Sequence, residues 1–120
     1  MTRQEMFNKA VRGLRSQGFE RCTRKAPNEY KDEVCVYDDG NGKHCAWGWV
    51  DESTWSYKEA RDTVDNLANR GVGLAASLPY EDRQWASRLQ QCHDKAYDAE
   101  GVEHNLRQFA KEFSLVFPED

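Results

Sequence analysis

The chain has 120 residues, with 21 acidic against 17 basic side chains and a net charge of -4. That length predicts a single domain, residues 1–120, around one hydrophobic core. The acids and bases are interspersed, which argues against a basic face for direct nucleic-acid binding. No apolar run is long enough for a bilayer and no apolar leader follows Met1, so we expect a cytoplasmic protein outside the membrane.

The N-terminal segment predicts a helix over residues 3–17. Thr2 and Glu5 form a capping-box pattern, in which the side chain of each residue bonds the backbone of the other. Gly18 suits the left-handed position that ends many helices, and Phe19 supplies the apolar residue just beyond it. The apolar residues at helical spacing between these signals are Met6, Phe7, Ala10, Val11 and Leu14.

Residues 33–50 predict an antiparallel β-hairpin. Residues 34–37 have strand propensity, and residues 38–42 contain Asp-Gly and Asn-Gly steps that tolerate positive φ in a turn. The second strand would run over residues 43–50, in a register that the sequence leaves open. A two-residue Asn-Gly loop would place Asp38 opposite Cys45, whereas a longer loop would place Cys35 opposite Cys45.

Three helices are predicted after the hairpin. A second capping box at residues 56–59 would start the first of them, with Gly71 beyond its end. Pro79 suits the first turn of the second helix, and Gly101 precedes most of the last one. Their apolar faces hold Ala60, Val64, Leu67 and Ala68, then Trp85, Leu89, Cys92 and Ala96, then Val102, Leu106, Phe109, Ala110 and Phe113. The predicted fold class is α+β: an N-terminal helix, a small antiparallel β-hairpin or sheet, then three helices packed on it.

Four cysteines raise the question of metal binding. In a reducing cytoplasm they would be free thiols or metal ligands rather than disulfides. Cys35, Cys45 and His93 are residue types that bind zinc, but the chain has no Cys-x-x-Cys knuckle. His44 would also point to the opposite face of a strand from its neighbour Cys45. We favour small buried thiols, and expect no cofactor.

A second hypothesis is thiol chemistry. Cys45, His93 and Asp94 are the residue types of a Cys-His-acid catalyst, provided that they come within hydrogen-bond reach of one another. The alternative is that His93 lies at the edge of the core and bonds the backbone, with Asp94 as a surface charge or a helix cap. We favour the alternative, and therefore a binding protein over an enzyme.

A third hypothesis is an aromatic binding surface. Trp47 and Trp49 would share one face of the predicted second strand. They cover the core if the helices close over that face, and form an interface patch if it is open. In the second case, acidic side chains at the hairpin tip would steer the protein toward a basic partner surface. The predicted contact residues are Tyr37, Asp38, Asp39, Trp47 and Trp49.

Several short motifs occur in order along most of the chain. They are Cys35-Val36-Tyr37, a glycine-containing turn at 40–42, Cys45-Ala46-Trp47-Gly48, Leu-Gln-x-x-His-Asp ending at Asp94, Phe109-Ala110 and Leu115. With them the chain resembles a group of uncharacterised small bacterial, phage and prophage proteins. The tryptophans at 47 and 49 depart from the aliphatic residues expected there.

The resemblance implies no established activity, but it implies a phage-type setting. Small proteins in that setting bind and inhibit host machinery, including CRISPR and other defence systems. We therefore predict an inhibitor, for example an anti-CRISPR protein, whose partner is a host or defence-system protein. The alternative is a small-molecule- or metal-binding protein centred on Cys45, His93 and Asp94.

Overall fold

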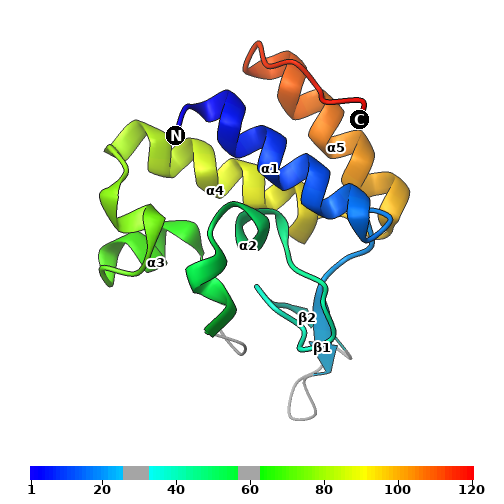
Figure 1. Ribbon diagram of the computed structural model, residues 1–120, viewed down its shortest axis with the longest axis horizontal. Coiled ribbons are helices and arrows are strands. Elements are labelled where there is room, and N and C mark those ends of the chain that lie inside the picture. The colour runs from blue at the N-terminus through cyan, green and yellow to red at the C-terminus, as the bar shows by residue number, and fades with distance from the viewer. Residues whose placement is uncertain (26–32, 57–62) are drawn as a thin grey trace.

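The computed structural model describes residues 1–25, 33–56 and 63–120, and over these residues the chain is mostly helical (Figure 1). The α-helices are α1 (Arg3–Ser16), α2 (Ala46–Val50), α3 (Val64–Asn69), α4 (Tyr80–Asp94) and α5 (Ala99–Glu112). Two short 3₁₀ helices are η1 (Glu52–Ser56) and η2 (Leu74–Ser77), and the strands are β1 (Thr23–Lys25) and β2 (Glu33–Cys35). Within the described ranges, no helix combines the length and the apolar character needed to cross a membrane.

Helix α1 begins and ends as the sequence predicts. The Thr2 hydroxyl accepts the N–H of Glu5 at 3.1 Å, and the Glu5 carboxylate accepts the N–H of Thr2 at 3.0 Å. At the other end Gly18 has φ 70°, and the N–H of Phe19 returns to the carbonyl of Leu14 at 2.7 Å. These bonds satisfy backbone groups that a helix end otherwise leaves unpaired.

The later helices confirm the predicted order but shift their starting points. Thr63 caps α3, since its hydroxyl accepts the N–H of Asn66 at 3.1 Å. The predicted capping box at 56–59 lies mostly outside the described residues. Gly71 follows α3 with φ 73°, as predicted, and Pro79 is the N-cap of α4 rather than its first helical residue.

The core forms where α1, α4 and α5 meet. The ring of Phe109 from α5 stacks on Phe7 from α1 at 5.8 Å, and packs against Trp85 from α4 at 5.5 Å. Helix α2 packs against both α1 and α4 and buries Trp47 completely. Figure 1 shows α3 and the two strands on opposite sides of α2. Helix α2 therefore lies at the centre of the molecule rather than at its edge.

The predicted hairpin over residues 33–50 is wrong, and so is the α+β class built on it. Strand β2 pairs with the preceding strand β1, with Thr23 opposite Cys35. The second half of the predicted hairpin is helix α2. Only an isolated bridge joins the two sides of the turn, and it places Asp38 opposite His44, so neither predicted register occurs.

Two side chains start α2 where a strand was expected. The Cys45 sulfur accepts the N–H of Gly48 at 3.3 Å. The side-chain oxygen of Gln90, on α4, accepts the N–H of Trp47 at 2.8 Å. The first amides of a helix have no partner within it, so these two acceptors stabilise the helical conformation. One of them comes from a residue 43 positions away, which strand propensity cannot anticipate.

Candidate functional site

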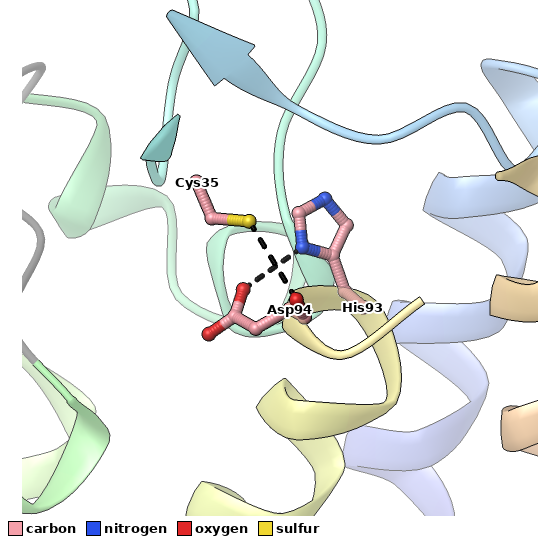
Figure 2. A group of neighbouring side chains, drawn as sticks. All are labelled: Cys35, His93 and Asp94. Atoms are coloured by element: carbon pink, nitrogen blue, oxygen red, sulfur yellow. Dashed lines mark hydrogen bonds and ion pairs between the residues drawn. The ribbon is translucent and has the colours of Figure 1, made fainter. Parts of the chain in front are cut away.

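Three side chains of metal-ligand type meet at the C-terminal end of α4 (Figure 2). Cys35 comes from β2, and His93 and Asp94 close α4. One ligand atom of each lies within 4.8 Å of the others. Among the described residues, this is the only group of three or more such side chains at that spacing. His93 is fully buried, Cys35 half-buried and Asp94 exposed.

The hydrogen bonds of His93 define which of its nitrogens carries a proton. Its Nε2 accepts the backbone N–H of Cys22 at 2.7 Å, and its Nδ1 lies 3.0 Å from a carboxylate oxygen of Asp94. A backbone amide only donates, so Nε2 holds the lone pair. The proton is therefore on Nδ1, from which it is donated to Asp94. Figure 2 marks this contact with a dashed line.

This tautomer does not suit a metal ion. A metal binds the lone pair of a neutral imidazole nitrogen, and the nitrogen nearest Cys35 and Asp94 carries a proton. Moving that proton to Nε2 would set two donors against each other and leave the buried Cys22 amide unpaired, at a cost of about 1–3 kcal/mol. The Cys35 sulfur also accepts a hydrogen bond from the Arg21 guanidinium at 3.0 Å. A bound cation would lie beside that positive charge.

The four cysteines are free, and their surroundings keep them protonated. Burial raises the pKa of the Cys22 and Cys92 thiols to about 12. Burial and the charge of Asp94 raise the pKa of Cys35, although Arg21 opposes the shift. A thiolate is the reactive and metal-binding form, so these environments disfavour both chemistries.

The predicted Cys45-His93-Asp94 catalyst is only partly assembled. The structure pairs His93 with Asp94, but Cys45 is fully buried and its sulfur accepts the Gly48 amide. Burial raises the pKa of Cys45 well above its ordinary value. Both ring nitrogens of His93 already have partners, so neither is free to take a proton from a thiol.

These contacts belong to a chain of hydrogen bonds that we call the His93 network. Gln90 donates to the Asp94 carboxylate at 2.9 Å and accepts the Trp47 amide, while His93 joins Asp94 to the Cys22 amide. The network therefore connects α4 both to α2 and to the segment that leads into β1. Its members explain the Leu-Gln-x-x-His-Asp motif as a structural link, with no catalytic role required.

The structure buries most of the predicted partner-contact residues. Trp47 is 0% exposed and Tyr37 is 2% exposed, so neither side chain can touch a partner directly. Asp38 is also buried, with its carboxylate 3.4 Å from Nδ1 of His44. Asp39 is half-buried, and one of its oxygens accepts two amides of its own turn. Of the five, Trp49 alone keeps a large aromatic surface in part exposed.

Trp49 belongs to an aromatic cluster that sequence reasoning missed. His44, Trp49 and Trp55 form what we call the aromatic ledge. The His44 and Trp55 rings stack at 3.8 Å and 9°, and Trp49 meets each of them edge-on, at 4.7 and 6.0 Å. Trp55 and Trp49 are both half-buried. A tryptophan inside the otherwise polar η1 was the available signal for Trp55.

The two indoles of the aromatic ledge are held in place by hydrogen bonds. Trp49 donates its ring N–H to the side chain of Gln17 at 2.9 Å, and Trp55 donates its own to the Gly48 carbonyl at 2.7 Å. Gly13 on α1 lies directly beneath Trp49, since a Cβ atom there would be 2.2 Å from the ring. The protein's own contacts therefore already fix the positions of the two indoles.

Comparison with known proteins adds no relative. No family model matches the chain, and no curated protein or solved structure matches it. Function is therefore inferred from the geometry of the two clusters, the His93 network and the aromatic ledge.

Proposed function

We propose that the protein acts by binding another protein through the aromatic ledge. The observation that carries this proposal is the pair of half-buried indoles, Trp49 and Trp55, fixed around His44. Tryptophan is the side chain most enriched among residues that dominate binding energy. Because hydrogen bonds already hold these rings, little side-chain entropy is lost when a partner covers them.

The kind of partner is inferred from the motifs and from charge. The resemblance to phage and prophage proteins supports a host or defence-system protein, for example a CRISPR component, that is inhibited on binding. The net charge of -4 favours encounter with a basic surface on that partner. The partner would place apolar or cationic side chains on the indole faces.

The alternative function, small-molecule or metal binding, has one observation in its favour, the close approach of Cys35, His93 and Asp94. The His93 tautomer and the Arg21 contact oppose it. Metal analysis of the purified protein, with Cys35→Ser as the control, separates the two functions. Stoichiometric zinc that is lost in the variant would favour the alternative, and metal-free protein would count against its metal-binding form.

Affinity capture from a bacterial host lysate tests the main proposal. We expect the wild-type chain to retain a stoichiometric protein partner, and Trp55→Ala to lose it. Tyr97→Ala is the matched control, because Tyr97 is 97% exposed and belongs to neither cluster. Circular dichroism must show that both variants remain folded. Retention of the same partner by folded Trp55→Ala would overturn the assignment of the ledge.

A further inference from the structure

The last residues of the chain have no regular secondary structure and lie against α1 and α5. We call residues 115–120 the C-terminal strap. The side-chain amide of Gln4 accepts the N–H of Val116 at 2.9 Å and donates to its carbonyl at 2.8 Å. The Val116 side chain itself is 74% exposed. At this position the surface therefore binds the main chain and places no demand on the side chain.

One aromatic ring anchors the strap. Phe117 meets Phe7 of α1 edge-on at 6.1 Å. The guanidinium of Arg107, from α5, lies 4.0 Å from the centre of the same ring, and that of Arg15, from α1, lies 5.6 Å from it. Two cations and an aromatic ring thus form a seat for an aromatic side chain, in which cation–π attraction adds to apolar contact.

The positions after the ring are recognised by charge. Arg15 donates to the Pro118 carbonyl at 2.5 Å. Arg107 pairs with both oxygens of Glu119, at 2.8 and 3.3 Å, and Arg12 pairs with Asp120 at 3.2 Å. These contacts lower the pKa of the Glu119 and Asp120 carboxyls. The surface therefore places a guanidinium beside each of two consecutive carboxylates, and the Arg107 guanidinium is shared with Glu103 of its own helix.

The strap does not satisfy every donor that surrounds it. The Nη1 atom of Arg15 is buried and has no hydrogen-bond partner among the described residues. A buried, unpaired guanidinium nitrogen is unfavourable, and a ligand with one more acceptor would remove that cost.

We propose that the surface formed by α1 and α5 is a peptide-binding site for extended segments with the pattern aromatic-Pro-acid-acid, and that the strap is its exchangeable internal occupant. Peptide-recognition sites combine hydrogen bonds to the main chain, a pocket for an aromatic side chain and arginines that pair with carboxylates. A partner segment with this pattern would compete with the strap. The site shares no residue with the aromatic ledge.

The test uses the full-length chain and a fluorescent peptide, Ser-Leu-Val-Phe-Pro-Glu-Asp, which reproduces the strap. A tethered segment competes at an effective concentration on the order of 1 mM, so the wild-type chain should bind the peptide weakly. Phe117→Ala combined with Glu119→Gln weakens the strap and leaves the α1 and α5 surface intact. We expect at least about tenfold tighter peptide binding by this variant, measured by fluorescence anisotropy.

A second substitution in the same background locates the site. Arg107→Gln should weaken peptide binding about tenfold, because it removes both the carboxylate pair and the cation above the ring. Arg88→Gln is the matched control: Arg88 pairs with Glu112 and lies over Phe113, and both of these residues precede the strap. Equal binding by the weakened-strap and wild-type chains, or equal losses from the two arginine substitutions, would overturn the proposal.

Hydrogen exchange in the wild-type chain covers the case in which the weakened-strap variant fails to fold. The Val116 amide is bonded only to the Gln4 side chain, whereas amides within α5 are bonded inside the helix. We expect Val116 to exchange at least about tenfold faster than Leu106, as an exchangeable segment must. Equal protection of the two amides would show that the strap does not open separately, and the proposal would fail.

Discussion

The His93 network and the aromatic ledge use similar residue types for opposite purposes. In the network, both ring nitrogens of a fully buried histidine bond other parts of the protein. In the ledge, the indole N–H groups are also bonded internally, but Trp49 and Trp55 remain in part exposed. The motif that looks catalytic therefore holds the fold together, and the surface available to a partner lies largely outside it.

His93→Ala should have the largest effect, and it tests whether the His93 network stabilises the fold. The substitution leaves a cavity in the core and strips the Cys22 amide of its acceptor. We expect the free energy of unfolding to fall by about 3 kcal/mol. Urea denaturation measures it, with the exposed neighbour Gln91→Ala as the control. A loss as small as that of the control would show that His93 does not support the fold.

Gly13→Ala tests the contact between α1 and Trp49 of the aromatic ledge. In the middle of a helix this change usually stabilises by about 1 kcal/mol. Here the new methyl group would overlap the Trp49 ring, so we expect a loss of about 2 kcal/mol and an altered tryptophan fluorescence spectrum. Increased stability with an unchanged spectrum would mean that Trp49 does not rest on α1.

Gln90→Ala sharpens the explanation of helix α2. It removes the acceptor of the Trp47 amide and a donor to Asp94. We expect a loss of about 1–2 kcal/mol in thermal or urea unfolding. Gln90→Glu retains the acceptor but places a second carboxyl group beside Asp94. As the pH rises through the range in which carboxyl groups ionise, the two negative charges repel, so the stability of this variant should fall further. A Gln90→Glu variant insensitive to pH would contradict the contact.

Acid should produce the smallest effect, through surface carboxyls whose pKa is lowered in the folded chain. Hydrogen bonds from Arg107 and Arg12 lower the pKa of Glu119 and Asp120 in the folded chain, and Arg88 does so for Glu112. Groups with a lowered folded-state pKa stabilise the fold above their ordinary pKa and lose that contribution as the pH falls through the lowered value. Exchange of the Val116 amide should therefore accelerate, relative to Leu106, below about pH 4. An unchanged ratio would mean that these pairs do not hold the strap.

The sequence was sufficient for the features governed by local rules. Cap residues on both sides of α1 and the glycine beyond α3 act within a few residues of themselves, so Thr2, Glu5, Gly18 and Gly71 could be interpreted directly. Apolar residues at helical spacing also predicted the later helices, although Thr63 caps α3 and Ser56 lies in η1.

The segment from Cys45 to Val50 could not be interpreted in this way. Trp47 and Trp49 share a face in a strand, whereas in a helix they are separated by about 200°. The structure adopts the helix, so Trp47 is fully buried and Trp49 reaches the surface. That choice depends on Gln90, a residue distant in sequence. The partner of His93 is also distant, which is why chemistry could not be separated from structure at that position.

The tautomer of His93 is the most direct test of this account. Nitrogen-15 NMR of the imidazole rings distinguishes a proton on Nδ1 from one on Nε2, in the absence and presence of one equivalent of zinc. We predict a neutral ring protonated on Nδ1, with a spectrum that zinc does not change, because Nε2 accepts the Cys22 amide. A ring protonated on Nε2, or a zinc-dependent shift of the His93 signals that Cys35→Ser abolishes, would contradict the structural role and restore the metal site.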